Sequence, residues 1–485
     1  MTDMTPIDVL LISVPVISEQ ERFYIPDFEI PLNVCYLAAA LERQEIHVAV
    51  LDMNVADPGF SLEQHVRALQ PRLAGFATYT PFINVAHSYA EKLKSALPGI
   101  MTVVGGYHAS ALPESTLEEF PHFDYLVAGE GEETLIELAR AVIQSEENKT
   151  DEDEIKQIKG LYFRANGTIS KTPPRPLITD VDTLPFPARH LLQQEKYKVN
   201  PINYVELPTT GILASRGCDH RCAFCSQSVF HGRARVRGAE NIAAEIEQCR
   251  ADFGMRGFRF YDDNLTAYRD SCLAFCELLL KRNIRVYWNC FSRVDSVDAE
   301  LLALMKRAGC HQLKLGVETG TEAMLDVIGK GITLEQSRRA VALTKRAGIE
   351  CQVSIILGLP AETLDDMRAT INFVREMSPD LVGYNLFKPM PGSPLFRKLD
   401  RAGLLLHKDW PEYSIKRTRP VVRDQYPVEV LEKMLSRAYL SFFFRPRYIL
   451  QRMKWFLRYP RRESVRLFTG LRYILLSLRR RRARI

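Results

Sequence analysis

The sequence predicts an α/β protein with two successive series of strands and helices, followed by a helical C-terminal tail. Apolar strand patterns alternate with amphipathic helix patterns five times before residue 150, and the alternation restarts after residue 208 to give six strands. Beyond residue 400 the alternation stops, and apolar residues mix with arginines at helical spacing. The expected domains are a sheet domain at 1–145, a linker at 146–205, a second domain at 206–400 and a basic helical region at 401–485.

The composition is that of a folded protein in a reducing compartment. Of its 485 residues, 46% are hydrophobic and 25% charged, enough for several buried cores. Apart from one cluster, the ten Cys lie scattered in apolar patterns, as reduced core thiols do. We find no basic signal-peptide region and no run of about 18 uncharged apolar residues that could span a membrane. We therefore expect a cytoplasmic protein.

The first series predicts a doubly wound parallel sheet of Rossmann-like type. The expected strands are Ile7–Val16, His47–Met53, Leu73–Thr80, Met101–Gly106 and Tyr125–Gly129, and the expected helices are Leu32–Arg43, Leu62–Leu69, Val85–Leu97, Pro113–Phe120 and Glu133–Gln144. Ligands of such sheets bind at the carboxyl ends of the strands, where glycines let a flat or phosphate-bearing ligand approach the backbone. The candidate residues at that edge are Tyr79, Thr80, Gly105, Gly106, His108, Glu130 and Gly131.

The stretch between the two series is predicted to be a linker. Its acidic beginning, Ser145–Glu154, is expected to be a solvated loop. Gly160–Lys171 alternates around an Asn-Gly pair, which indicates a hairpin. The Pro-rich stretches at 173–176 and 184–190 are expected to be stiff.

The second series supplies six strands, and polar residues follow them. The expected strands are Gly211–Ser215, Gly257–Tyr261, Arg285–Phe291, His311–Val317, Cys351–Leu357 and Leu381–Phe387, and the expected helices are Ala239–Phe253, Cys272–Arg282, Ala299–Ala308, Leu334–Ala347 and Leu364–Met377. Polar residues just past strand ends in β/α barrels are typical of catalytic sites, although any single one could equally be a helix cap or a turn former. The candidates are Asp262, Asp263, Arg293, Glu318 and Gly358. Tyr261 and Tyr384 are expected in the core, with a place at the border of the substrate as the alternative.

Cys218, Cys222 and Cys225 lie within eight residues, directly after the first strand of the second series. Thiolates at this spacing wrap around one soft metal centre. Three thiolates on a four-iron cluster would leave one iron open to a small molecule. The alternative is a structural zinc site, which usually takes four ligands; no second Cys pair lies nearby, but His220 and His231 could complete it.

The C-x-x-x-C-x-x-C spacing, with Phe224 before the last Cys, resembles the radical S-adenosylmethionine (SAM) superfamily. The resemblance implies a partial (β/α)6 TIM-like barrel and a [4Fe-4S] cluster, held by the three catalytic Cys, whose open iron takes the amino and carboxylate groups of SAM. It also implies roles for the strand-end residues. Asp262 and Asp263 would bind the SAM amino group, Arg293 the carboxylate, Glu318 the ribose hydroxyls, and Gly358 the adenine.

Most of residues 5–145 resemble the cobalamin-binding domain that precedes many radical SAM enzymes. The matching residues are PLNVCYLAAALERQEIHVAVLD, VVGGYHASALPE and DYLVAGEGEE. The chain lacks the D-x-H-x-x-G loop whose His ligates cobalt in many cobalamin proteins, so a bound cobalt would have no histidine ligand from that loop. His65 is expected to be an ordinary surface histidine. His108 is the expected polar contact to cobalamin, with a role in capping its own turn as the alternative.

The order of the segments is similar to that of the cobalamin-binding radical SAM family, which includes methylases of unactivated carbon or phosphorus and the anaerobic magnesium-protoporphyrin ester cyclase. The resemblance implies a 5′-deoxyadenosyl radical that takes a hydrogen from an sp3 carbon, and a methyl group delivered by cobalamin to a small-molecule substrate. An electron donor such as flavodoxin or ferredoxin would reduce the cluster. Oxidative cyclisation or rearrangement needs the same site and stays open, as does a non-catalytic metal-binding regulator.

The positive charge of the chain is concentrated in its tail. Residues 445–485 carry 14 Lys/Arg and one acidic residue, a balance of +13, which leaves −8 of the total +5 for residues 1–444. Apolar residues between arginines at helical spacing are typical of a helix on an anionic membrane surface, which would suit a lipophilic substrate. The alternatives are a solvated tail, a helical subdomain packed on the barrel with its arginines outside, and nucleic-acid binding, which the acidic body disfavours.

Overall fold

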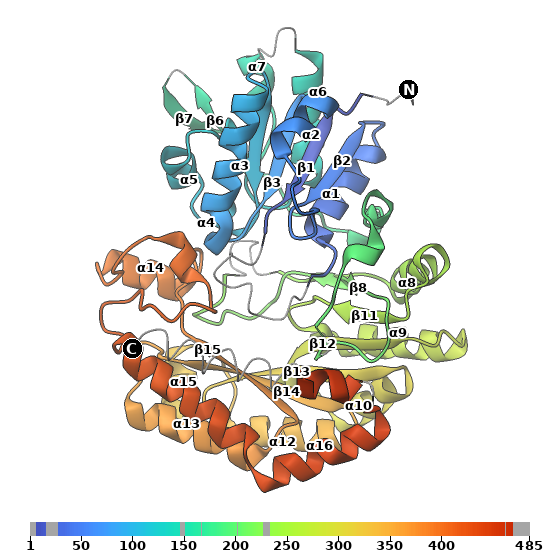
Figure 1. Ribbon diagram of the computed structural model, residues 1–485, viewed down its shortest axis with the longest axis vertical. Helices are drawn as coiled ribbons and strands as arrows, with labels where there is room; N and C mark the ends of the chain where they lie inside the picture. Colours follow the sequence, from blue (N-terminus) through green and yellow to red (C-terminus); the bar gives the residue numbers. More distant parts are fainter. Residues whose placement is uncertain are drawn as a thin grey trace.

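The computed structural model describes residues 6–15, 28–145, 151–165, 167–200, 202–226, 233–460 and 462–468. Within these ranges two β-sheets lie one above the other along the long axis of the molecule, and α15 (Val428–Phe443) and α16 (Pro446–Arg458) run along the end that is far from the first sheet (Figure 1). The predicted α/β architecture is therefore confirmed.

The first sheet has the strand order β2-β1-β3-β4-β5-β6-β7. Its strands are β1 Val9–Ser13, β2 Val48–Asp52, β3 Leu73–Ala77, β4 Met101–Gly105, β5 Tyr125–Val127, β6 Leu161–Ala165 and β7 Thr168–Lys171. Its helices are α1 Leu32–Glu42, α2 Leu62–Leu69, α3 Ile83–Ala96, α4 Tyr107–Ala111, α5 Pro113–Glu119, α6 Glu132–Gln144 and α7 Glu152–Ile155. Alternate residues of β1 pack on opposite faces, Leu10 beside Ala86 of α3 and Leu11 beside Val34 of α1, so both faces of the sheet are covered as a doubly wound fold requires.

The predicted hairpin is confirmed, but it extends the first sheet. β5 pairs antiparallel with β6, and β6 pairs antiparallel with β7. This part of the linker therefore extends one side of the parallel strands β1–β5 by two antiparallel strands. Two short helices were not predicted, α4 directly after β4 and α7 inside the expected loop. Both are only a few residues long, too short for their apolar periodicity to be recognised.

The second sheet has six parallel strands in the order β15-β14-β13-β12-β11-β8. Its strands are β8 Thr209–Ile212, β11 Gly257–Phe260, β12 Tyr287–Arg293, β13 Cys310–Glu318, β14 Glu350–Leu357 and β15 Leu381–Leu386, and its helices are α8 Ala239–Phe253, α9 Arg269–Lys281, α10 Ala299–Arg307, α11 Glu322–Val327, α12 Leu334–Arg346 and α13 Leu364–Met377. Buried and half-buried residues alternate along β14 and β15, because one face packs on the helices and the other faces the inside of the open barrel.

A two-stranded antiparallel pair closes the base of the loop that contains the cysteines. β9 (Ser215–Arg216) precedes this loop and pairs with β10 (Arg235–Val236), which follows it. Gly217 directly follows β9 and has φ +86°, and a Cβ there would overlap with the carbonyl oxygen of Arg233. This position therefore requires glycine.

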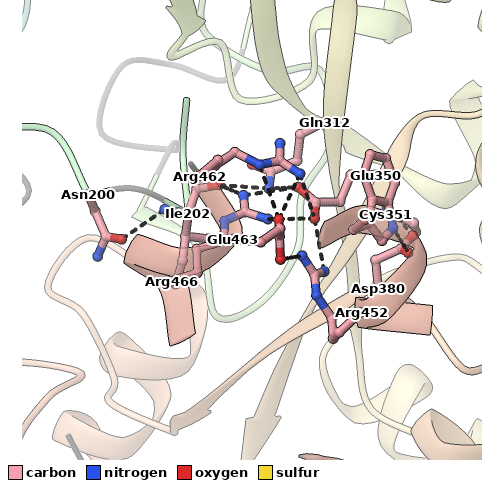
Figure 2. A network of polar contacts seen from close by, with 11 residues as sticks. Asn200, Ile202, Gln312, Glu350, Cys351, Asp380, Arg452, Arg462, Glu463 and Arg466 are labelled. Atoms are coloured by element: carbon pink, nitrogen blue, oxygen red, sulfur yellow. Dashed lines mark hydrogen bonds and ion pairs between the residues drawn. The ribbon is translucent and has the colours of Figure 1, made fainter. Parts of the chain in front are cut away.

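The described part of the basic tail packs on the barrel through a buried ion cluster, shown in Figure 2. Arg452 of α16 and Arg466 of the helical residues 462–468 bind the fully buried Glu350 at 3.1 and 2.7 Å, and Arg466 also binds Glu463 at 3.0 Å. Burial would raise the pKa of Glu350, but Arg466, Arg462 and Arg452 outweigh it and hold that pKa well below its usual range. The alternative of a helical subdomain packed on the barrel is thus confirmed for these residues, but its arginines were expected outside, and Arg452, Arg462 and Arg466 bind the buried Glu350 instead. Residues 469–485 lie outside the described ranges.

None of the helices that the structure describes is long and apolar enough to cross a bilayer.

Glu350→Gln should lower the free energy of unfolding by about 3–5 kcal/mol at pH 7, because one buried and two partly buried arginines lose their shared carboxylate. The folded pKa of Glu350 is depressed, so its contribution is complete above the ordinary carboxyl pKa of about 4.3 and is lost as the pH falls below it. Denaturant unfolding at pH 7 and pH 3 should therefore show a smaller difference between variant and wild type in acid. Glu335→Gln, at an exposed pair on α12, is the matched control and should change little.

Candidate functional site

A cavity of about 510 Å³ lies between the two sheets, at the carboxyl ends of their strands. Its wall on the side of the first sheet contains Gly105, the last residue of β4, Gly106, which follows it, and Gly131, which precedes α6. The wall on the side of the barrel contains Gly217 and Asp262. The same cavity therefore reaches both the strand ends of the first sheet and the start of the cysteine loop.

The wall formed by the first sheet is built of glycines and aromatic rings. Gly106 has φ +98°, and a Cβ there would lie 2.5 Å from the carbonyl oxygen of Thr78, so this close approach requires glycine. The rings of Tyr79 and Tyr107 stack with centroids 5.6 Å apart, and Tyr79 is 47% exposed. A flat ligand would find both bare backbone and exposed ring surface on this wall.

The cysteine loop is held from two sides by neighbouring elements. Ala223, between the second and third Cys, donates its N–H to Ile328 O at 2.7 Å and accepts from Leu395 N at 2.8 Å. The three Cys side chains are half-buried and form no disulfide. In the described ranges no group of three His, Cys, Asp or Glu side chains is arranged to hold a single metal ion. The donor set, three thiols on one anchored loop, fits the chemistry of an iron–sulfur cluster.

Arg293, the last residue of β12, contacts the cysteine loop through one nitrogen. Its Nη1 lies 3.5 Å from Cys222 Sγ, while Nε and Nη2 bind Asp295 at 2.9 and 2.8 Å, and Nη2 also donates to Lys330 O at 2.7 Å. The fork that was expected to hold the SAM carboxylate is thus occupied by Asp295. The role of Arg293 toward the SAM carboxylate stays a prediction, and in this structure its remaining nitrogen, Nη1, contacts a thiol sulfur.

Glu318, the last residue of β13, forms a buried ion pair that was not predicted. Its Oε1 lies 2.8 Å from Lys330 Nζ, and both side chains are almost fully buried. The ammonium group also lies 5.7 Å from the ring centroid of Phe224, in the cysteine loop. The only sequence signal for Lys330 is its place between two glycines in a turn.

The two aspartates after β11 have different environments. Asp262 is buried and accepts hydrogen bonds from Ala214 N and Ser215 Oγ, and burial raises its pKa to about 6. Its carboxylate therefore fixes the turn between β8 and β9. Asp263 is exposed and lines the cavity, so of the two it has the better access to a ligand.

Gly358, after β14, lies in a tight turn outside the lining of the cavity. It has φ +79°, and its N–H donates to Glu362 Oε2. Burial raises the pKa of Glu362 to about 7. Gln425, from the C-terminal segment, donates to the carbonyl oxygens of Gly358 and Phe387 and so covers the ends of β14 and β15.

The structure places Thr80 and His108 away from the cavity, so the expected polar contact of His108 is corrected. His108 Nδ1 lies 3.3 Å from Thr80 Oγ1, and its ring packs edge-on against Trp410 at 4.8 Å. Burial lowers the pKa of His108 to about 4, so the ring is neutral near pH 7. The cause is the unpredicted helix α4, which turns this side chain into the protein. No histidine is among the described residues that line the cavity.

Glu130 lines the cavity but binds two arginines of the barrel. Its carboxylate lies 2.7 Å from Arg235 and 3.3 Å from Arg216, and Arg216 also binds Glu132 at 2.6 Å. Burial would raise the pKa of Glu130, but Arg235 and Arg216 outweigh it and lower that pKa. These ion pairs connect the first sheet to the base of the cysteine loop.

A second contact between the two halves comes from the C-terminal segment. Trp410 Nε1 donates to Glu119 at 2.9 Å while its ring packs on His108. A third joins Glu29, which precedes α1, to Arg259 at 2.8 Å and to the Tyr261 hydroxyl.

Of the two tyrosines that were expected in the core, one does not pack there. Tyr261 is 36% exposed and lines the cavity, so that prediction was wrong, whereas Tyr384 is buried as predicted. No pattern in the sequence distinguishes the two.

Comparison with known proteins covers both halves of the chain. The family model of the radical SAM superfamily matches residues 212–374, and the model of the B12 binding domain matches residues 25–139. An uncharacterized methyltransferase, PH0819, from Pyrococcus horikoshii is 32% identical over 87% of this chain and 89% of its own. An anaerobic magnesium-protoporphyrin IX monomethyl ester cyclase from Rubrivivax gelatinosus is 31% identical over 89% of this chain and 75% of its own.

Solved structures share the fold. The radical S-adenosylmethionine methyltransferase TsrM from Kitasatospora setae, solved with cobalamin and a [4Fe-4S] cluster, has a TM-score of 0.66 at 20% identity, covering 82% of this chain and 76% of its own. The cobalamin-dependent S-adenosylmethionine radical enzyme OxsB has a TM-score of 0.68 at 19% identity, covering 83% of this chain and 63% of its own.

Gly106→Ala should destabilise the protein more than Gly129→Ala, although both glycines have positive φ and line the cavity. A Cβ at Gly129 meets nothing within 4 Å, so that change pays only the backbone cost of about 1–2 kcal/mol. A Cβ at Gly106 also overlaps with the backbone of Thr78. Thermal unfolding of the two variants measures the difference. Equal melting temperatures would show that the backbone of Thr78 can shift to make room for the Cβ.

Proposed function

Because this chain belongs to the family of radical SAM proteins with a B12-binding domain, we propose that it transfers a methyl group to an unactivated carbon of a small-molecule substrate. The observation that carries this proposal is the shared cavity. The strand ends within the B12-binding match and those within the radical SAM match line it together, and the cysteine loop begins at its edge. Two reactive groups must come together in such a reaction, and a cavity that both halves of the protein line would allow this.

The cysteine residues Cys218, Cys222 and Cys225 would hold a [4Fe-4S] cluster, which when bound supplies the electron that cleaves SAM; a flavodoxin or ferredoxin would reduce it. Phe224, between two of these ligands, would lie beside the bound SAM. Arg293 Nη1, 3.5 Å from Cys222 Sγ, would place a positive charge beside that ligand.

The remaining SAM contacts follow from the positions of the strand ends. Asp263, exposed to the cavity, would accept hydrogen bonds from the SAM amino group. Asp262 supports it by fixing the turn before the cysteine loop. Glu318 would accept hydrogen bonds from the ribose hydroxyls, and the backbone of the tight turn at Gly358 would lie beside the adenine.

The wall of the first sheet would hold cobalamin, which when bound supplies the methyl group. Gly105, Gly106 and Gly131 leave backbone accessible there, beside the ring of Tyr79. Glu130 would act indirectly, since its carboxylate holds the wall against Arg216 and Arg235. Contacts across the edges of the cavity also limit the entry of water, which protects reactive species.

Oxidative cyclisation without methyl transfer is the second candidate, because the cyclase from Rubrivivax gelatinosus is nearly as similar to this chain as PH0819. The two reactions differ in the fate of SAM. Methylation consumes one SAM as the methyl donor and yields S-adenosylhomocysteine beside 5′-deoxyadenosine, whereas cyclisation yields 5′-deoxyadenosine alone.

Cys222→Ala should abolish 5′-deoxyadenosine formation, because a cluster ligand is lost, whereas wild type should form both 5′-deoxyadenosine and S-adenosylhomocysteine. The measurement uses the full chain, reconstituted anaerobically with iron, sulfide and cobalamin and reduced with dithionite, and quantifies both products by mass spectrometry. Cys249→Ala, which changes a buried thiol of α8, is the control and should retain both products. Zinc in place of iron in wild type, or 5′-deoxyadenosine from Cys222→Ala, would contradict the assignment.

We further infer that the C-terminal helices rest on an anionic membrane surface, which supports a lipophilic substrate. Large apolar side chains are exposed along them, namely Phe444, Ile449, Leu450, Met453, Leu457, Leu467 and Phe468. The tail from residue 445 onward carries a balance of +13, so apolar surface and positive charge occur in one region. The buried arginines around Glu350 do not contribute to that surface.

Wild type should float with vesicles that contain phosphatidylglycerol and much less with pure phosphatidylcholine, because both apolar burial and anionic lipid contribute. The double variant Leu450→Ser/Leu457→Ser removes two exposed apolar side chains of α16 and should weaken flotation severalfold. Leu406→Ser, at a leucine outside these helices that is 50% exposed, should leave flotation unchanged. Equal flotation of all three proteins, or none, would refute membrane contact through this face.

A further inference from the structure

Lys330 is a buried cation at the edge of the barrel that none of the roles above uses. It lies between α11 and α12, and only 6% of it is exposed. Its ammonium group binds Glu318 Oε1 at 2.8 Å and lies 5.7 Å from the ring centroid of Phe224. One side chain thus contacts both the end of β13 and the cysteine loop.

The main chain around Lys330 also binds the cysteine loop. Ile328 O accepts from Ala223 N at 2.7 Å, between the second and third Cys. Lys330 O accepts from Arg293 Nη2 at 2.7 Å, and the same guanidinium reaches Cys222 Sγ through Nη1. The segment 328–330 therefore sets the position of the loop and of the arginine beside it.

The ion pair of Lys330 is accommodated at a cost to the local backbone. Glu318 is a non-glycine residue with φ +70°, in the left-handed region, and the register between β13 and β14 shifts at this point. A Cβ at Gly316 would lie 2.5 Å from Glu318 Oε1 and 2.9 Å from Lys330 Nζ, so glycine provides the space for the pair. Strained backbone of this kind persists where the surrounding structure requires it, commonly at functional sites.

We propose that Lys330 is a positioning residue for SAM, which fixes the carboxylate of Glu318 at the end of β13 and joins it to the cysteine loop. The ammonium group binds Oε1, which leaves Oε2 to accept hydrogen bonds from the ribose hydroxyls. It also balances the charge of Glu318, which would otherwise be a buried carboxylate without a counterion. The inference rests on the proposed function, since it assigns Lys330 a role in SAM binding.

The test measures SAM affinity of the full-length, anaerobically reconstituted protein by equilibrium dialysis, together with the electron paramagnetic resonance spectrum of the reduced cluster. Lys330→Met should raise the Kd for SAM about tenfold, the effect of one charge-assisted hydrogen bond. Iron content and the spectrum recorded without SAM should stay as in wild type. Lys330→Arg, which keeps the charge, should recover most of the affinity.

A matched control separates SAM binding from the general loss of an ion pair. Lys94→Met, on α3, removes the pair of Lys94 with Asp124 at 2.7 Å, far from the barrel in sequence, and should leave the Kd unchanged. A lower melting temperature of Lys330→Met with an unchanged Kd would mean that the pair is only structural, which overturns the inference.

A second variant covers the case in which Lys330→Met does not fold. Glu318→Gln/Lys330→Met removes both charges and leaves no buried carboxylate without a partner. This variant should fold and bind SAM at least about tenfold more weakly than wild type, and wild-type affinity would overturn the inference. If wild type itself neither binds nor cleaves SAM, the proposed function fails. If wild type binds SAM and the variants bind it equally well, only the inference about Lys330 fails.

Discussion

The structure depends on one constraint, which is that the parallel strands of two sheets, from separate parts of the chain, face each other with their carboxyl ends. Parallel sheets bind ligands at that edge, so each half alone offers a half-open site. The ion pairs of Arg216 with Glu130 and Glu132 connect the two halves. Because Arg216 is also the last residue of β9, the contact between the sheets and the start of the cysteine loop are the same structural unit.

The second organising feature is the placement of charge around the cysteine loop. Arg293 approaches a thiol directly, while Lys330 is balanced by Glu318 and lies over Phe224. Positive groups beside these cysteines would affect the reduction potential of a cluster bound there. The carboxylates of Asp295 and Glu318 hold these cations in place, so anions further from the loop determine how the cations near it are oriented.

The local pattern of the sequence was enough to predict the strands, most helices and the position of the cysteine loop, because periodicity and motif spacing are properties of neighbouring residues. The orientation of individual side chains was not predictable in this way. His108 follows a strand end, yet α4 turns it toward Trp410, which lies about three hundred residues later in the chain. Arg293 follows the pattern of a ligand fork, yet Asp295 occupies it. The arginines of the tail were expected at its surface, facing lipid or solvent, yet several bind Glu350 on β14.

The contact between Trp410 and Glu119 has a consequence for how the protein is made. A ribosome completes the first sheet early and the six barrel strands before residue 390, so both walls of the cavity exist before Trp410 is synthesised. Trp410 lies outside the lining of the cavity, so its hydrogen bond braces the first sheet against the C-terminal segment and adds no wall. This link between the two halves can therefore form only after the segments that build both walls have been synthesised.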